Sequence, residues 1–134
     1  MNGIELIEAL HSGKQMYGTM VTTPVHRWLD IVRELNIDCV FLDTEHNPID
    51  WLELGWMIQA YRAVGIAPIV RIPRANPFDA CRVFDIGAEG IVAAYVETPE
   101  EVQQLRSAAK LRPLKGRKLA DILSGRSFAA LLSC

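Results

Sequence analysis

Four short apolar segments recur along the chain, and amphipathic segments separate them. The apolar segments are nearly continuous, which is typical of strands covered on both faces in a parallel sheet. The amphipathic segments place apolar residues three or four positions apart, as helices with one buried face do. One further helix is expected in front of them. The predicted strands span residues 16–22, 38–43, 67–72 and 90–96, and the predicted helices span 25–36, 50–65, 77–87 and 99–111.

Polar residues followed by proline mark the expected helix starts. Thr and Asn side chains can accept a hydrogen bond from a helix N-terminus, and proline is tolerated at the first helical position because no N–H is needed there. Glu101 stands where it would complete a capping box. Gly65 and Gly87 stand where two helices have to end before the next strand. The predicted starts are Thr23-Pro24, Asn47-Pro48, Asn76-Pro77 and Thr98-Pro99.

Repeated strand–helix units admit two architectures, an open doubly wound sheet or a closed (β/α)8 barrel. No predicted strand is followed by a glycine-rich nucleotide-binding loop, which disfavours the open sheet. Four units with a helix in front amount to half of a barrel of about 250 residues. We therefore predict an α/β fold, the N-terminal half of a (β/α)8 TIM barrel, in which residues 1–134 form a single partial domain without strands 5–8. A half barrel has two open sheet edges, so we interpret the chain as a fragment in preference to a half completed by a partner.

Composition and charge narrow the class of protein. Half of the residues are hydrophobic and the net charge is −2, which suits one globular core. Glu5 and Glu8 interrupt the apolar N-terminal stretch, unlike a secretory signal, and the longest uncharged apolar runs fall short of the roughly 20 residues that cross a bilayer. We expect a cytoplasmic protein with no membrane partner. The cysteines lack metal-ligand spacing and are predicted to be buried hydrophobic residues; they are Cys39, Cys81 and Cys134.

Basic residues cluster near the end of the chain, where Asp121 is the nearest acid. They are Lys110, Arg112, Lys115, Arg117, Lys118 and Arg126. Nucleic-acid binding would favour a basic chain with aromatic residues among the charges, whereas this chain is net acidic and the segment lacks that pattern. We therefore predict a solvated face and no nucleic-acid partner.

Polar side chains follow the second and third predicted strands, at the edge where both architectures place their active sites. The second strand leads into Asp43, Thr44, Glu45 and His46, the third ends at Arg71, and the fourth leads into Tyr95. Consecutive strands are expected to be neighbours about 5 Å apart. His46 and Arg71 should therefore face one shared opening at this edge of the sheet, which we call the mouth.

These residue types suit a general base beside an anion clamp. His46 is suited to proton transfer near neutral pH, and Asp43 lies close enough in sequence to fix its tautomer. Arg71 offers a planar fork for a carboxylate or phosphate. Each also has a structural alternative: Asp43 could cap the turn that follows, and His46 could be an ordinary loop residue. Glu45 could pair with Arg71 or Arg74. The coincidence of His46 and Arg71 on one edge favours the functional interpretation.

Three motifs together resemble the HpcH/HpaI aldolase family, the metal-dependent (class II) pyruvate aldolases of the phosphoenolpyruvate/pyruvate barrel superfamily. They are the turn D-x-E-H-x-P, the strand end V-R-x-P and the segment G-A-x-G-I…V-x-T-x-E-E, and the resemblance extends to about Lys118. It implies a (β/α)8 barrel, usually hexameric, that cleaves or forms 4-hydroxy-2-oxo acids with pyruvate as one product. It also implies a divalent metal, Mg²⁺, Mn²⁺ or Co²⁺, that chelates the pyruvate part and stabilises its enolate.

The resemblance assigns roles to individual residues. His46 matches the catalytic base, Asp43 the acid paired with it, and Arg71 the arginine that binds the substrate and steadies the enolate. The family's metal ligands are a Glu and an Asp after strands 5 and 6, in segments that are missing from these 134 residues. The resemblance therefore implies metal ligands beyond residue 134, a 2-oxo acid substrate and a homo-oligomer, and it leads us to expect no activity from this chain alone.

Two other readings of the function stay open. One is a non-catalytic half barrel that binds anions or self-associates through its open edges. The other is a related lyase that acts on acyl-CoA substrates, such as the citrate lyase beta subunit, for which the sequence offers no additional support.

Overall fold

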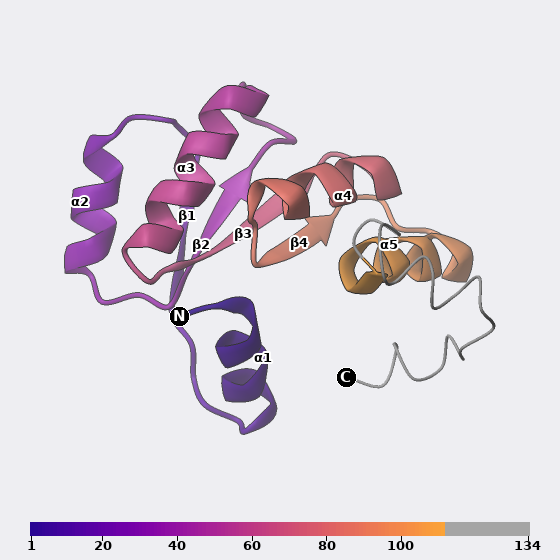
Figure 1. Cartoon of the computed structure of the whole chain (residues 1–134), viewed down its shortest axis with the longest axis horizontal. Coiled ribbons are helices and arrows are strands. Elements are labelled where there is room, and N and C mark those ends of the chain that lie inside the picture. The colour runs from indigo at the N-terminus through magenta and orange to yellow at the C-terminus, as the bar shows by residue number, and fades with distance from the viewer. Residues whose placement is uncertain (112–134) are drawn as a thin grey trace.

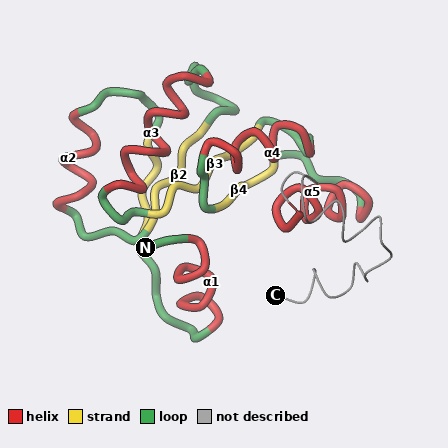
Figure 2. The backbone as a smooth tube through the Cα atoms, viewed as in Figure 1, coloured by secondary structure: helices red, strands yellow, loops and turns green. Residues whose placement is uncertain are grey.

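Four parallel strands form the sheet in the computed structural model, which describes residues 1–111. The strands lie side by side in sequence order, and each neighbouring pair is parallel. Figure 1 shows helices α2 to α5 following one another along the sheet, and Figure 2 shows the same strand and helix order along the backbone. The strands are β1 (Gly18–Val21), β2 (Cys39–Asp43), β3 (Ala67–Ile72) and β4 (Gly90–Ala93). The helices are α1 (Gly3–His11), α2 (Arg27–Glu34), α3 (Trp51–Ala63), α4 (Pro77–Ile86) and α5 (Pro99–Leu111).

The predicted order of elements, four strand–helix units behind one extra helix, is confirmed. Strands β1 and β4 are shorter than the predicted 16–22 and 90–96. Beyond β4 the backbone leaves the extended region, because Tyr95 has a φ of 54°. Gly87 ends α4 with a φ of 114°, a conformation in which a residue with a Cβ is strained.

The predicted helix starts at Asn76 and Thr98 are confirmed. The Asn76 side chain accepts a hydrogen bond from the N–H of Phe78, with proline at the first helical position of α4. Thr98 and Glu101 exchange side-chain and backbone hydrogen bonds across the first turn of α5, which is the predicted capping box.

The predicted helix starts at Thr23 and Asn47 are wrong. Helix α2 begins after His26, which makes no side-chain capping bond. Helix α3 is capped by Asp50, whose carboxylate accepts from the N–H of Glu53 while the Glu53 carboxylate accepts from the N–H of Asp50. An acid with a Glu three residues later satisfies two N–H groups at once, and Asn47 is left to bond elsewhere.

The two faces of the sheet differ in burial. Side chains alternate between the faces along each strand, and one face packs against the helices. Its central residues Val40, Leu42 and Val70 are fully buried in the core cluster. Met20 and Val92 lie on the other face and are 54% and 42% exposed. Within residues 1–111, the prediction that both faces are covered therefore holds for one face only.

No helix in the described part of the chain has both the length and the apolar character needed to span a bilayer.

Capping by Asp50 gives the first testable prediction. Replacing Asp50 with Ala removes the acceptor for the Glu53 N–H and should lower the free energy of unfolding by about 1 kcal/mol. Asp50→Asn keeps an acceptor oxygen and should lower the free energy of unfolding by only about 0.3 kcal/mol. Urea denaturation followed by circular dichroism measures both variants. Equal losses in the Ala and Asn variants would show that the side-chain cap does not stabilise α3.

Candidate active site

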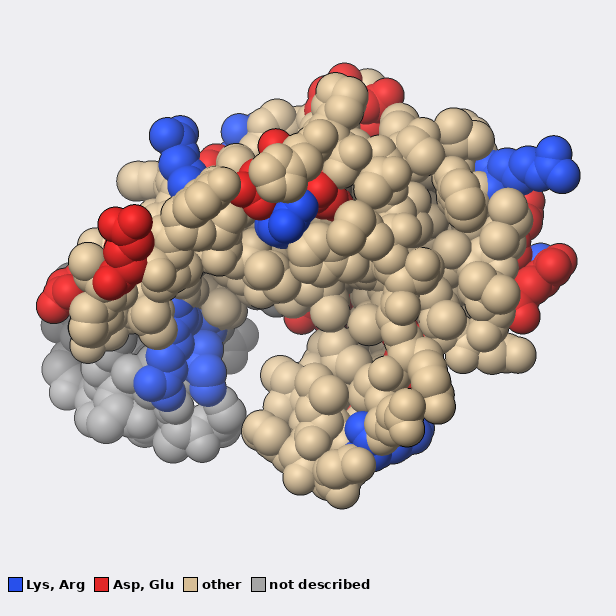
Figure 3. Space-filling view, turned by 180° about the vertical axis from the view of Figure 1, so that it is seen from behind, with Lys and Arg blue, Asp and Glu red and all other residues tan. Residues whose placement is uncertain are grey.

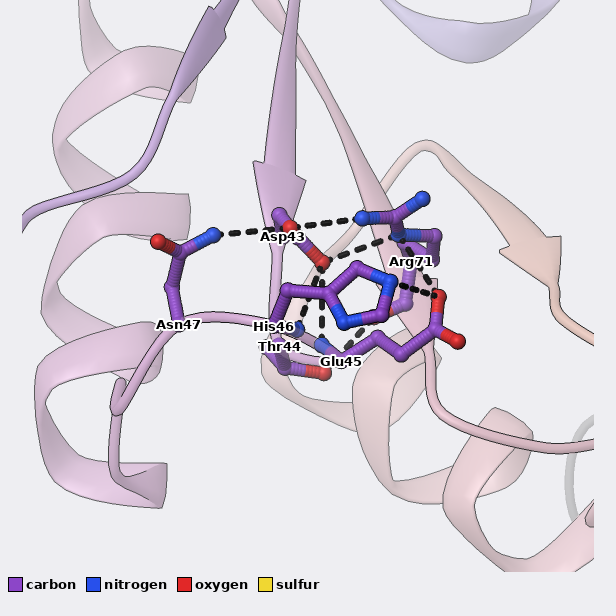
Figure 4. Close-up of polar contacts among 6 residues, drawn as sticks. All are labelled: Asp43, Thr44, Glu45, His46, Asn47 and Arg71. Atoms are coloured by element: carbon purple, nitrogen blue, oxygen red, sulfur yellow. Dashed lines mark hydrogen bonds and ion pairs between the residues drawn. The ribbon is translucent and has the colours of Figure 1, made fainter.

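The ends of β2 and β3 bring two charged residues together at the carboxyl edge of the sheet. Asp43 and Arg71 are directly paired in the register of these strands, so their side chains lie on the same face. The backbone N–H of Thr44 donates to the carbonyl oxygen of Arg71 at 3.3 Å, and its hydroxyl donates to the same oxygen at 2.6 Å. These bonds continue the contact between the two chain segments one residue beyond the strand (Figure 4).

Asp43 and Arg71 form a bidentate ion pair. Arg71 Nε donates to Oδ1 of Asp43 at 2.9 Å, and Nη2 donates to Oδ2 at 2.6 Å. The Asp43 side chain is 2% exposed and that of Arg71 is 23% exposed. Two parallel N–H···O bonds fix the orientation of the guanidinium group as well as its position.

The turn after β2 donates further hydrogen bonds to Asp43. Oδ1 accepts from the backbone N–H groups of Glu45 at 2.9 Å and of His46 at 3.4 Å, and Oδ2 accepts from Nδ2 of Asn47 at 2.7 Å. The bond from Arg71, helped by the backbone N–H groups, lowers the pKa of Asp43 to about 2 although burial opposes this shift. The same pair raises the pKa of Arg71. Asp43 is therefore a charged carboxylate over the whole physiological pH range.

Glu45 makes the second set of contacts at the mouth. Its Oε2 lies 3.1 Å from Nε of Arg71 and 3.5 Å from Nε2 of His46. The Glu45 side chain is 9% exposed, whereas that of His46 is 64% exposed. The hydroxyl group of Tyr95 donates to Glu45, and this bond raises the pKa of Tyr95. Figure 4 shows the Glu45 carboxylate joined by dashed lines to the His46 ring and to Arg71.

The residues predicted for the mouth are found together, but one contact differs from the prediction. Asp43 was expected to orient the His46 imidazole. Both of its carboxylate oxygens instead bond to Arg71, to Asn47 and to backbone N–H groups. The imidazole lies beside Glu45, and the predicted pairing of Glu45 with Arg71 is confirmed. The guanidinium group of Arg71 forms two parallel hydrogen bonds with the Asp43 carboxylate. This pairing explains why Asp43 does not orient the imidazole.

Two residues of this network had no predicted role there. Asn47 was interpreted as a helix cap, and its amide group bonds to Asp43 instead. Tyr95 follows β4, the next strand along; it was expected at this edge of the sheet but was given no role.

A metal does not fit the residues that the structure describes. Within residues 1–111, no group of three or more His, Cys, Asp or Glu side chains is placed to hold a metal ion. The carboxylates of Asp43 and Glu45 both contact the guanidinium group of Arg71, which competes with any cation. Asp121 lies outside the described residues.

Other predicted features lie partly outside the described residues. Cys39 and Cys81 are free and partly buried, whereas Cys134 falls outside, as does the basic segment after Lys110. Figure 3 shows one face on which the described Lys and Arg side chains lie among Asp and Glu side chains and a larger uncharged surface. On that face the described residues form no continuous basic stripe of the kind that nucleic-acid binding uses.

The sequence matches known proteins over most of its length. Residues 19–123 match the family model described as HpcH/HpaI aldolase/citrate lyase. The chain is 36% identical over 84 residues to the hydroxypyruvate/pyruvate aldolase of Rhizorhabdus wittichii, which covers 63% of this chain and 34% of that protein. It is 31% identical over 104 residues to the pyruvate aldolase of Rhizobium etli, covering 78% of this chain and 41% of that protein. The chain thus spans less than half the length of these two relatives.

Solved structures show the same relationship. The HpcH/HpaI aldolase from Desulfitobacterium hafniense DCB-2 matches with a TM-score of 0.70 and 27% identity, over 90% of this chain and 52% of that chain. The citrate synthase SbnG matches with a TM-score of 0.73 and 30% identity, over 90% of this chain and 49% of that chain. The matched folds are TIM barrels of which this chain corresponds to about half, so the predicted half barrel is confirmed.

The ion pair at the strand ends predicts how stability depends on pH. The pKa of Asp43 falls from its ordinary value of 3.8 to about 2 in the fold. The resulting stabilisation, about 2 kcal/mol, is fully present above the unfolded pKa and is lost as the pH falls through the folded pKa. Asp43→Asn should therefore flatten the fall in the free energy of unfolding between about pH 5 and pH 2. Urea denaturation at a series of pH values measures this dependence.

Asp30→Asn, a change at an exposed acid of α2, is the matched control and should keep the wild-type pH dependence. If the Asp43 variant and the wild type lost stability in parallel over this range, Asp43 would not be the acid that the ion pair holds charged.

Proposed function

The chain belongs to the HpcH/HpaI aldolase/citrate lyase family, and on this premise we propose that the protein containing it is a metal-dependent aldolase. It cleaves 4-hydroxy-2-oxo acids to pyruvate and an aldehyde. The observation that carries the proposal is the fixed guanidinium group of Arg71 beside the exposed imidazole of His46 at the carboxyl edge of the sheet. That edge is where (β/α)8 barrels place their active sites.

Arg71 is the anion-binding group of the proposed site. Its Nε and Nη2 are used by Asp43 and Glu45. Among residues 1–111, no hydrogen bond or ion pair uses Nη1, which leaves it for a substrate oxygen. Because Asp43 fixes the plane of the guanidinium group, Arg71 meets the substrate without losing further side-chain freedom. Preorganised donors of this kind stabilise negative charge that develops during a reaction.

His46 is the proposed base. Its exposed ring can reach the C4 hydroxyl group of a substrate whose carboxylate end lies toward Arg71. Removal of the hydroxyl proton by His46 lets the C3–C4 bond break, and the aldehyde leaves with the former hydroxyl oxygen as its carbonyl oxygen. The bonding electrons remain on the three-carbon part as an enolate, which Arg71 steadies until protonation at C3 gives pyruvate.

The charges at the mouth support a requirement for a cation. Asp43 and Glu45 contribute two negative charges against one positive charge on Arg71, so the anion of a 2-oxo acid would bring the sum to −2 with His46 neutral. A divalent cation held beside the substrate anion would offset this negative charge locally. The described residues do not supply its ligands, so we place the Glu and Asp ligands outside them. Mg²⁺, Mn²⁺ or Co²⁺ as the metal, a homo-oligomeric (hexameric) assembly and a cytoplasmic location belong to the same proposal.

Removal of the proposed base should affect turnover selectively. In the form of the protein that releases pyruvate with Mg²⁺ or Mn²⁺, His46→Gln should lower kcat by about 10²–10⁴-fold with little change in KM, because proton transfer is lost and the anion clamp is kept. Coupled pyruvate detection measures both constants. His26→Gln, a change at a histidine whose ring packs against that of Trp56 of α3, is the control. An unchanged kcat in the His46 variant would refute its role as base.

The 134-residue chain alone should not release pyruvate from a 4-hydroxy-2-oxo acid, even with added Mg²⁺ or Mn²⁺. The reason is that the described residues hold no metal-binding group and that Asp121 is the only carboxylate side chain of residues 112–134. Pyruvate release from the purified chain measures this, with a longer form of the protein as the positive control. Metal-dependent turnover by the chain alone would contradict the proposed location of the ligands.

A non-catalytic half barrel is the second candidate function. The observation that favours it is the partly exposed apolar sheet face that carries Met20 and Val92, between the two open edges of the described sheet. On this alternative the chain should self-associate in size-exclusion chromatography with light scattering. It should also bind pyruvate saturably without metal in calorimetry. On the aldolase proposal, metal-free pyruvate binding is weak because the anion meets a mouth of net negative charge.

A further inference from the structure

Glu45 is the carboxylate of the mouth that the proposed reaction leaves unused. Its oxygen Oε2 contacts two groups at once, Nε of Arg71 at 3.1 Å and Nε2 of His46 at 3.5 Å. The side chain is 9% exposed, and the residue precedes His46 directly in the turn after β2. A mostly buried carboxylate held by a guanidinium group is a fixed acceptor, whereas a surface acid would sample many rotamers.

His46 needs such a fixed neighbour. Its side chain is 64% exposed and follows a strand end in a turn, so the ring has room to rotate away from the mouth. The other carboxylate, that of Asp43, already bonds to Arg71, Asn47 and the backbone. Asp43 reaches His46 through the backbone N–H at 3.4 Å. That bond fixes the turn and leaves the direction of the ring to another group.

We propose that Glu45 is a positioning residue that holds the His46 imidazole in place at the mouth. The inference rests on the proposed function for its consequence in catalysis. The claim that Glu45 holds the His46 ring does not depend on turnover. With Nε2 directed at Glu45, Nδ1 is the nitrogen available to accept the substrate proton.

The order of the His46 ring tests this directly in the 134-residue chain. Carbon-13 relaxation of histidine rings gives an order parameter for each of the three histidines. His11 on α1 is an exposed reference, and His26 is a held reference because its ring lies 4.0 Å from that of Trp56. In the wild type, His46 should be clearly more ordered than His11. Glu45→Gln should lower its order toward that of His11, because the neutral amide loses the ion pair with Arg71 that fixes residue 45 and is a weaker acceptor for the imidazole N–H.

Two further variants complete the experiment. Glu8→Gln, the same change at an exposed position of α1, should leave the His46 ring unchanged. Glu45→Asp keeps the charge and draws it back by one methylene group, so it should lower the order of His46 in part. A His46 ring as mobile as His11 in the wild type, or an unchanged ring in folded Glu45→Gln, would overturn the proposal. If Glu45→Gln fails to fold, an unchanged ring in Glu45→Asp would overturn it.

The kinetic consequence is measured in the form that turns over. Glu45→Gln should lower kcat by roughly tenfold and leave KM within about twofold, since loss of a supporting partner commonly costs about 10–100-fold in activity. A raised KM with unchanged kcat would mean that Glu45 acts only through Arg71, and would overturn the proposal. Absence of turnover in every form would refute the proposed function and leave the ring measurement to decide on Glu45.

Discussion

The bidentate ion pair between Asp43 and Arg71 is the interaction on which the rest of the mouth depends. It joins two adjacent strand ends at register-paired positions. Because both residues are held by backbone pairing, the guanidinium group is fixed in position and in plane. Oδ1 of Asp43 also accepts hydrogen bonds from the backbone N–H groups of Glu45 and His46, and these bonds fix the turn that follows β2. One buried carboxylate thus sets both the anion-binding group and the loop that carries the histidine.

Much of this arrangement could be predicted from the sequence. Nearly continuous apolar strands and periodic helices indicated the parallel α/β order, and parallel strands place their carboxyl ends on one edge. That reasoning brought His46 and Arg71 to one mouth. The partners within the mouth were harder to predict. Asp43, Glu45 and His46 lie within four residues, so sequence spacing alone allows either acid to reach the imidazole, and only the competition with Arg71 decides between them.

Each of the errors has a physical cause. Asn47 was interpreted as a helix cap because Asn before Pro is a common helix start. Asp50 caps α3 instead, because Asp50 and Glu53 together satisfy two N–H groups. Tyr95 was expected at this edge without a role, and no local pattern indicated the positive φ of its backbone. The sequences of β1 and β4 did not predict that Met20 and Val92 would be exposed. This exposure reflects how much of the barrel these four strands represent, a property of the whole fold.

The central claim is that Arg71, fixed by Asp43, binds the 2-oxo acid once a divalent cation balances the charge of the mouth. The most direct test follows the nitrogen-15 signal of the Arg71 side chain in the form of the protein that releases pyruvate, while pyruvate is added with and without Mg²⁺. The account predicts a saturable shift of that signal with both present, little shift with pyruvate alone, and loss of the shift in Asp43→Asn. A stationary Arg71 signal while pyruvate and Mg²⁺ bind would contradict it.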